Sequence, residues 1–225
     1  LIHGLGCSSA AFGPLMLRWD ADAEPRPALA PDMPGYGRSD APRRALDIAA
    51  LADWTLEFLD VMAVPRVHVV GHSMGCQVAL ALARRAPTRA RSVTLIGPTT
   101  GDECQGLLRY GLGLAADAFA ESLAWNWTLT RMALQMGVRR YVPTLRHLLR
   151  DRPIAGAAAV RCPVLALRGV HDFIIRRDAA QRLAAALPLG LYRELPVGAH
   201  ALQYTHPALF WAACRPFVDA AERDE

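Results

Sequence analysis

Short apolar runs alternate with amphipathic stretches along most of the chain. Runs bounded by turn formers are typical of buried strands, which we expect at 27–31, 67–70, 92–96, 162–168 and 189–195. The first residues, Leu1 to Gly6, predict the end of a further strand that runs into a glycine loop. Apolar positions at helical spacing predict helices at 10–19, 47–62, 77–85, 176–187 and 207–221. This alternation indicates an α/β fold, with a mostly parallel sheet and helices on both faces.

The pattern changes between residues 98 and 160, where strand signals stop and the sequence becomes helix-like. Strands flank this segment, so we interpret 98–160 as a helical cap inserted after the strand at 92–96, into a core made of 1–97 and 161–225. Most of its aromatic and methionine side chains are expected to serve packing. A few should face an apolar ligand, because Met is adaptable and Trp is large. The candidates for a substrate-binding wall are Trp125, Trp127 and Met132.

Composition narrows the classes of function. The 225 residues carry a net charge of +4, and each of the 25 basic residues is Arg. The absence of Lys excludes Schiff-base chemistry and a phosphate loop that carries Lys. Scattered Arg residues without interleaved aromatics argue against nucleic-acid binding, and no apolar run is long enough to span a membrane. The five cysteines are odd in number and lack a C-x-x-C pair, which favours reduced thiols and a cytoplasmic setting.

Candidate chemistry centres on Gly71-His72-Ser73-Met74-Gly75, which stands between a predicted strand and a predicted helix. A strand, a glycine-flanked serine and a helix form the context that a nucleophile elbow requires. Side chains at Gly71 and Gly75 would collide with the neighbouring strand and helix in so sharp a turn. The strained Ser73 is then presented at the carboxyl end of the sheet, at the positive end of the following helix.

A serine hydroxyl needs a base to take its proton and an acid to hold that base in one tautomer. On this architecture the expected chain order is serine, acid, histidine, and Ser73, Asp172 and His200 satisfy it. Each of the three follows a predicted strand, so we expect them to meet at the carboxyl edge of the sheet. Asp102 or Glu103, which follow the strand at 92–96, stay open as an alternative acid.

Other polar residues near the elbow have structural interpretations. His72 should point away from the nucleophile into the fold. His68 and His72 are four positions apart, but they lie on a strand and its turn with no acidic ligand near, so no metal site is predicted. Gly4 and Gly6 leave the backbone bare, and such a loop can aim an N–H at a reacting oxygen.

Five motifs together resemble the alpha/beta-hydrolase fold superfamily, in its lidded small-molecule branch. In chain order they are His3-Gly4-Leu5-Gly6, Asp32-Met33-Pro34-Gly35-Tyr36-Gly37-Arg38-Ser39-Asp40, Gly71-His72-Ser73-Met74-Gly75, Gly169-Val170-His171-Asp172 and Gly198-Ala199-His200. The resemblance covers the whole chain except the insertion. It implies that Ser73 attacks a carbonyl carbon, that His200 is general base and then general acid, and that Asp172 orients His200. It also implies an oxyanion hole made by the backbone N–H groups of Leu5 and Met74.

The expected function is a serine hydrolase, by default a carboxylesterase, that cleaves a small ester or related acyl bond through a covalent acyl-enzyme. Neither a metal nor a cofactor is implied, and the expected partner is a small-molecule substrate, not nucleic acid or a membrane. Hydrolysis of a carbon–carbon bond in a ring-cleavage dione, of a thioester or of a lactone uses the same triad and stays open. A ligand-binding protein that kept the fold and lost turnover is the alternative from another class.

The resemblance also concerns the start of the chain. Members of this superfamily usually carry two strands before the H-G-x-G motif, whereas this sequence begins just before His3. We therefore expect an N-terminally truncated sheet of six parallel strands, with a stub as the first and Pro27 to Pro31 as an uncovered edge. We also expect the isolated chain to be unstable or prone to aggregation, and an N-terminal extension to restore it.

Overall fold

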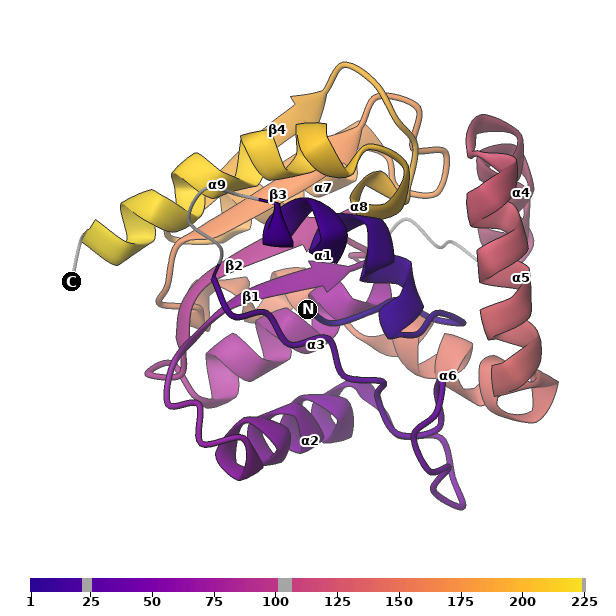
Figure 1. Cartoon of the computed structure of the whole chain (residues 1–225), viewed down its shortest axis with the longest axis horizontal. Coiled ribbons are helices and arrows are strands. Elements are labelled where there is room, and N and C mark those ends of the chain that lie inside the picture. Colours follow the sequence, from indigo (N-terminus) through magenta and orange to yellow (C-terminus); the bar gives the residue numbers. More distant parts are fainter. Residues whose placement is uncertain (22–25, 101–106, 224–225) are drawn as a thin grey trace.

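A computed structural model describes residues 1–21, 26–100 and 107–223, and it is built on a parallel sheet (Figure 1). Four strands lie side by side in chain order: β1 (Val67–His72), β2 (Ala90–Ile96), β3 (Val164–Gly169) and β4 (Gly190–Leu195). Each neighbouring pair is parallel. The carboxyl ends of all four strands therefore lie at one edge of the sheet, which is the edge where the predicted site residues follow them.

Helices cover both faces of the sheet, as the alternating pattern predicts. One face carries α2 (Ile48–Val61), α3 (Met74–Arg85) and α7 (Arg177–Ala186), whose apolar side chains join one buried cluster. The other face carries α1 (Gly13–Asp20), which continues from the short η1 (Ser9–Phe12), together with α8 (Leu202–Thr205) and α9 (Pro207–Arg223). The indole rings of Trp19 and Trp211 pack there with their centroids 4.1 Å apart. β1, β2 and β3 are largely buried between these two layers, which explains their apolar sequences, whereas the edge strand β4 is only partly covered.

The described chain between β2 and β3 consists mainly of helices and contains no strand. It forms α4 (Leu107–Ala120), α5 (Leu123–Met136), α6 (Val138–Arg150) and η2 (Pro153–Ala159). Ser122 accepts a hydrogen bond of 3.1 Å from the backbone N–H of Trp125 and so caps the start of α5. In Figure 1, α4 and α5 stand together at one side of the sheet, on the right.

Two strand predictions at the start of the chain need correction. Residues Pro27 to Pro31 form no strand, and the first residues contribute only a single parallel bridge from Ile2 to Gly71. The expected stub is confirmed, but the sheet has four named strands within the described residues instead of six. Prolines at both ends of the 27–31 run remove the N–H groups that a ladder needs. The run still lies beside the stub, because the Leu1 amino group donates a hydrogen bond of 2.7 Å to the Leu29 carbonyl.

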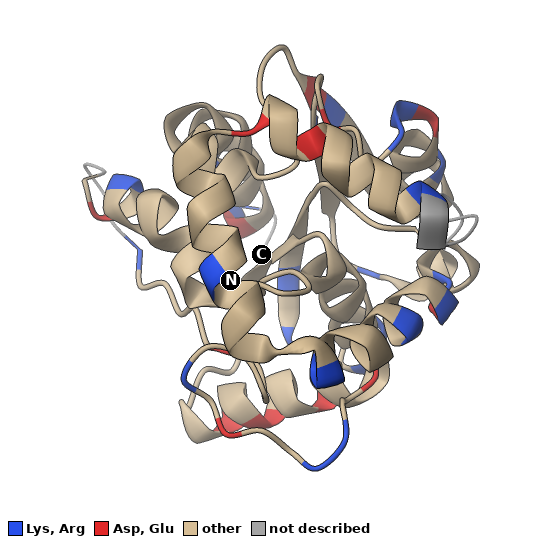
Figure 2. Cartoon of the chain, turned by 90° about the vertical axis from the view of Figure 1, so that its right-hand side faces the viewer, with Lys and Arg blue, Asp and Glu red and all other residues tan. Residues whose placement is uncertain are grey.

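Charged residues are spread over many elements of the molecule. Figure 2, which views the side that carries α4 and α5, shows basic and acidic positions on separate helices and loops. Many of them form ion pairs at the surface, such as Arg85 with Asp53. Within the described part of the chain, no helix is both long enough and apolar enough to cross a bilayer.

Candidate active site

Ser73 stands at the turn between β1 and α3 in a backbone conformation that L-residues rarely adopt. Its φ is +54° and its ψ is −119°, and its side chain is buried. A Cβ at Gly71 would collide with the carbonyl of Gly75, and a Cβ at Gly75 would collide with the carbonyl of Ile2. Only glycine fits at these two positions, so the predicted elbow geometry is confirmed.

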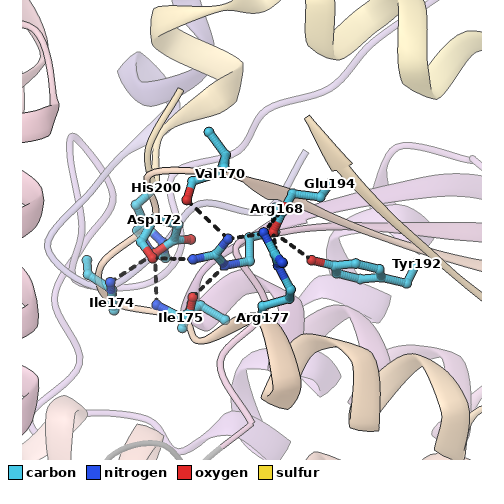
Figure 3. A network of polar contacts seen from close by, with 9 residues as sticks. All are labelled: Arg168, Val170, Asp172, Ile174, Ile175, Arg177, Tyr192, Glu194 and His200. Atoms are coloured by element: carbon cyan, nitrogen blue, oxygen red, sulfur yellow. Dashed lines mark hydrogen bonds and ion pairs between the residues drawn. The ribbon is translucent and has the colours of Figure 1, made fainter. Parts of the chain in front are cut away.

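Asp172 and His200 meet directly at the carboxyl ends of β3 and β4. His200 Nδ1 lies 2.9 Å from Asp172 Oδ2, and both side chains are buried. The other carboxylate oxygen of Asp172 accepts hydrogen bonds from the backbone N–H groups of Ile174 at 3.0 Å and Ile175 at 2.8 Å (Figure 3). The two backbone N–H groups hold Oδ1 and so fix the orientation of the carboxylate. Oδ2 is then placed to accept the Nδ1–H of the imidazole.

Gly97 shows how closely the three predicted residues converge. It follows β2, has a φ of +54°, and a Cβ there would lie 2.6 Å from His200 Nδ1 and 3.1 Å from Asp172 Oδ2. The preceding residue, Ile96, accepts a hydrogen bond of 2.9 Å from the backbone N–H of Ser73. Two adjacent residues at the end of β2 therefore contact Ser73 on one side and the His200–Asp172 pair on the other.

The electrostatic surroundings of His200 favour its charged form. Burial acts to lower the pKa of His200, but the carboxylates of Asp172, Asp117 and Glu121 outweigh it and raise the pKa to about 9. These carboxylates therefore favour the imidazolium form of His200 over the neutral ring. A histidine that must accept a proton would be fully available only in alkaline solution.

The loop from His3 to Gly6 lies directly against Ser73. A Cβ at Gly4 would be 3.0 Å from the Ser73 Cβ. His3 Nε2 accepts a hydrogen bond of 3.0 Å from the backbone N–H of Met33, so its Nδ1 carries the proton and donates to the Gly4 carbonyl at 3.0 Å. Burial of this ring lowers the pKa of His3 to about 4. The neutral imidazole thus ties the glycine loop to the loop that begins at Asp32.

The two backbone N–H groups expected to form an oxyanion hole flank this contact. Leu5 follows Gly4, and Met74 follows Ser73 as the first residue of α3. Among the described residues, neither N–H donates a hydrogen bond to a backbone carbonyl. A helix N-terminus and an unpaired loop amide next to a serine together offer donors for a developing negative charge.

His72 does not take the orientation expected from the sequence. Its imidazole ring lies 5.0 Å from the His200 ring and 6.1 Å from the Trp125 ring, measured between centroids. Its side chain therefore packs beside the site instead of pointing away from it, since α5 supplies an aromatic partner on that side. Burial, followed by the nearby His200, holds the pKa of His72 well below its ordinary value.

The three predicted wall residues on α5 do not share one environment. Trp125 is buried against His72 and Tyr204, and the Met132 sulfur accepts a hydrogen bond of 3.2 Å from the backbone N–H of Ser8. Trp127 is 67% exposed and does not join them. Two positions along an α-helix turn a side chain by about 200°, which takes Trp127 to the opposite face.

The alternative acids Asp102 and Glu103 lie outside the described residues. Asp178, a further acid after β3, is exposed in the first turn of α7 and pairs with Arg176 and Arg182, so it belongs to the surface.

Sequence reasoning missed an arginine that supports the acid turn. Arg168 at the end of β3 is buried, and its guanidinium donates to the carbonyls of Asp172 at 2.7 Å and Ile175 at 2.7 Å (Figure 3). It also donates to Glu194 at 2.7 Å. One signal was present in the sequence, because a charged residue at the end of an apolar strand is rarely buried without a partner.

Two acidic residues near His200 were also missed. Asp117 on α4 and Glu121 just after it are 5% and 8% exposed, respectively, and both influence the ionisation of His200. Nothing in the local sequence marks them, because their proximity to His200 depends on how α4 packs.

The fold and the elbow define a hydrolase of the α/β class. The sequence matches the model of the alpha/beta hydrolase family over residues 1–213, and the chain belongs to that family. Among curated relatives it is 39% identical to a pimeloyl-[acyl-carrier protein] methyl ester esterase of Neisseria meningitidis, over 99% of this chain and 93% of that protein. It is 30% identical to a putative carbamate hydrolase of Variovorax paradoxus, over 93% of this chain and 87% of that protein.

Solved structures show the same fold. A thermophilic esterase from Thermogutta terrifontis superposes with a TM-score of 0.82 at 16% identity, covering 98% of this chain and 88% of that one. An enol-lactonase from Burkholderia xenovorans gives a TM-score of 0.76 at 18% identity, covering 97% and 89%. Together with the fold, the family match and the two curated relatives identify the chain as an enzyme of the hydrolase class.

Proposed function

We propose that the chain is a serine hydrolase that cleaves a small carboxylic ester through Ser73, His200 and Asp172. The observation that carries the proposal is the buried hydrogen bond of 2.9 Å between His200 Nδ1 and Asp172 Oδ2, next to a serine at an elbow. This arrangement supplies a nucleophile, a base and the acid that selects the tautomer of the base. It lies where parallel α/β sheets place their sites, at the carboxyl ends of the strands.

The chemistry would run in two halves. His200 Nε2 takes the proton of the Ser73 hydroxyl while Oγ attacks the carbonyl carbon of the ester. The tetrahedral intermediate then expels the alcohol, which leaves with the proton from His200, and an acyl-enzyme remains on Ser73. Water attacks this acyl-enzyme with His200 again as base, and the carboxylic acid is released as Ser73 regains its proton.

The negative charge of each tetrahedral intermediate would be stabilised by the N–H groups of Leu5 and Met74. The proposal rests on the contact between Gly4 and Ser73, which brings the Leu5 amide near the serine, and on the position of Met74 at the start of α3. Loss of one such donor typically costs about 3 kcal/mol in the transition state.

An ester is the preferred substrate class because a relative that is 39% identical over nearly the whole chain is named a methyl ester esterase. The helices from residue 107 to 159 would roof the site as a cap. Buried Trp125 and Met132 approach it from α5, which favours an apolar part of the substrate on that side.

The test is turnover of p-nitrophenyl acetate and butyrate by wild-type protein and by Ser73→Ala. We expect activity to vanish in Ser73→Ala. The matched control is Ser92→Ala, since Ser92 bonds to His68 at 2.8 Å near the amino ends of the strands and should leave turnover intact. Persistent activity in purified Ser73→Ala protein would disprove the assignment.

A fluorophosphonate probe separates an enzyme from a binding protein that lost turnover. Covalent labelling requires an activated hydroxyl, so we expect a modified peptide that contains Ser73. A panel of esters, thioesters, lactones and ring-cleavage diones then ranks the substrate classes by kcat/KM. A higher kcat/KM for any class other than esters would overturn the ester assignment while leaving the triad in place.

A further inference from the structure

Two carboxylates four positions apart face the site from α4. Asp117 lies in the helix, and Glu121 follows its last residue, with its backbone N–H still donating to the Asp117 carbonyl at 2.9 Å. The two side chains therefore lie on one face, one helical turn apart. Both are almost fully buried, which is unusual for acids and needs a compensating set of contacts.

Glu121 contacts the turn that carries the histidine. Its Oε1 accepts a hydrogen bond of 2.6 Å from the backbone N–H of Ala201, the residue directly after His200. The His200 backbone also contributes hydrogen bonding that favours the ionised form of Glu121.

Asp117 faces the turn that carries the acid. The backbone of Phe173, the residue directly after Asp172, acts on the Asp117 carboxyl group and favours its ionised form. One turn earlier on α4, a Cβ at Gly113 would be 3.1 Å from the Phe173 carbonyl and 3.4 Å from the Ile174 Cα. The helix therefore packs directly against the backbone of this turn, and a larger residue than glycine would be crowded there.

We propose that Asp117 and Glu121 are positioning residues that clamp the acid turn and the histidine turn to one face of α4. The inference rests on the proposed roles of Asp172 and His200. Glu121 holds the residue that follows His200 by a hydrogen bond, and α4 packs at Gly113 against the residues that follow Asp172, so a shift of α4 would move both turns together. The cap would in this way set the alignment of the triad as well as cover it.

The clamp also has an electrostatic side. The titratable groups that face His200 are Asp172 from the acid turn, Asp117 and Glu121 from the α4 face, and His72 from the end of β1. Burial raises the pKa of Asp117 to about 7 and raises that of Glu121. Asp117 Oδ1 is buried and has no hydrogen-bond partner among the described residues, so its charge is compensated mainly through space. Negative charge on the pair stabilises the imidazolium of His200.

Substitutions at Glu121 separate the effect of its hydrogen bond to Ala201 from the effect of its negative charge. Glu121→Gln keeps an oxygen acceptor for the Ala201 N–H and removes the charge, whereas Glu121→Ala removes both. We expect Glu121→Gln to shift the pH at half-maximal kcat/KM downwards by about 0.5 or more and to leave the alkaline plateau within about threefold of wild type. Glu121→Ala should in addition lower kcat by about tenfold or more with little change in KM, because the histidine turn loses its anchor.

The control is Glu57→Gln on the exposed face of α2, which removes one negative charge far from the site and should change neither the midpoint nor kcat. Asp117→Asn should also lower the midpoint, since it mimics the protonated acid. If Glu121→Gln and Asp117→Asn both keep the wild-type midpoint and Glu121→Ala keeps the wild-type kcat, the clamp does not exist. A purely structural role would lower the melting temperature of these variants without moving the midpoint, and that result also overturns the proposal.

A second measurement does not depend on turnover. NMR titration of the His200 ring in folded protein gives its pKa directly, and we expect a lower pKa in Glu121→Gln than in wild type. An inactive wild-type protein with this lowered pKa in the variant would reject the proposed hydrolase function and support the clamp. An active protein in which the His200 titration is identical in wild type and Glu121→Gln, and in which Glu121→Ala keeps the wild-type kcat, would retain the function and reject the clamp. If Glu121→Ala fails to fold, the NMR titration of His200 in Glu121→Gln and Asp117→Asn tests the clamp in its place. An unchanged His200 pKa in both variants then rejects it.

Discussion

The backbone carbonyl of Asp172 accepts a hydrogen bond of 2.7 Å from Arg168 Nη2, so a buried guanidinium braces the turn that carries the proposed catalytic acid (Figure 3). The same side chain is held by Glu194 at 2.7 Å. This arrangement makes the end of β3 a rigid platform, because the guanidinium fork satisfies several acceptors at once.

We expect Arg168→Met to lower the free energy of unfolding by about 3 kcal/mol, because carbonyls and a carboxylate lose a buried partner. It should also reduce kcat by loosening the Asp172 turn. Urea unfolding and ester turnover measure the two effects. Arg177→Met is the control, since Arg177 reaches the same Glu194 from the surface and its loss should change the stability far less. Equal effects in the two variants would contradict a special role for Arg168.

The activity should depend steeply on pH. His200 has a pKa of about 9 in the folded protein, so kcat/KM is expected to rise with pH and to reach half its maximum near pH 9. Asp172→Asn removes the strongest attraction for the imidazolium and should lower that midpoint, together with a loss of turnover of several orders of magnitude. A midpoint near the ordinary histidine value in wild-type protein would show that the surrounding carboxylates do not act on His200.

The same shift contributes to stability. The folded pKa of His200 lies above the ordinary value of 6.5, so the protonated ring stabilises the fold fully below pH 6.5. This contribution should fade as the pH rises through about 9. The comparison of wild-type and His200→Gln unfolding at pH 6 and pH 10 measures it, and parallel stability curves would refute it.

Gly97 should tolerate no side chain. Gly97→Ala forces a left-handed φ on a non-glycine residue and places its methyl 2.6 Å from His200 Nδ1, so we expect kcat to fall roughly 100-fold or more. Gly111→Ala is the matched control in α4, where an added Cβ meets nothing within 4 Å. That variant should gain roughly 0.5–1 kcal/mol of stability and keep full activity. Normal turnover in Gly97→Ala would show that the His200–Asp172 pair can move aside.

Acid should loosen the glycine loop through His3. The folded pKa of about 4 lies below the ordinary 6.5, so stability is full above pH 6.5 and falls as the pH drops towards 4. Over that range the loss amounts to about 3 kcal/mol, since protonated Nε2 can no longer accept from Met33. His3→Gln cannot ionise, so its stability should fall less over the same range than that of wild type. Identical acid sensitivity in the two proteins would rule His3 out as the cause.

The two tryptophans of α5 should behave differently. Trp125→Ala opens the buried side of the site, so we expect a changed preference between short and long acyl esters and a loss of stability of about 3 kcal/mol. Trp127→Ala removes an exposed side chain and should alter neither property by more than a small margin. Acyl-chain profiles of kcat/KM for both variants decide whether Trp125 lines the substrate pocket.

Some errors in the sequence interpretation have a common physical cause. The run Pro27 to Pro31 has the apolar composition of a strand, but a strand forms only where a neighbour pairs with its backbone, and local sequence does not reveal that neighbour. The prediction for the orientation of His72 was wrong for a related reason. His72 ends β1, and its ring packs near Trp125, which belongs to a helix distant in the sequence.

The sequence by itself determined what depends on neighbours along the chain. The strand, Ser73 between Gly71 and Gly75, and the following helix are specified by steric rules that act over a few residues. The order of strands and helices in turn determined a parallel sheet whose carboxyl ends share one edge. Asp172 and His200 could therefore be predicted to meet, although they lie 28 positions apart.

Only the tertiary structure decided which other side chains surround that pair. Glu121 and Ala201 are 80 positions apart, and their hydrogen bond exists because α4 packs against the histidine turn. Asp117 reaches the acid turn through the same packing. Helix packing depends on the shapes of whole faces that meet in space, and no short stretch of sequence encodes such a face. The local chain thus specifies the residues of the proposed triad, whereas the packing of α4 specifies the charges around it.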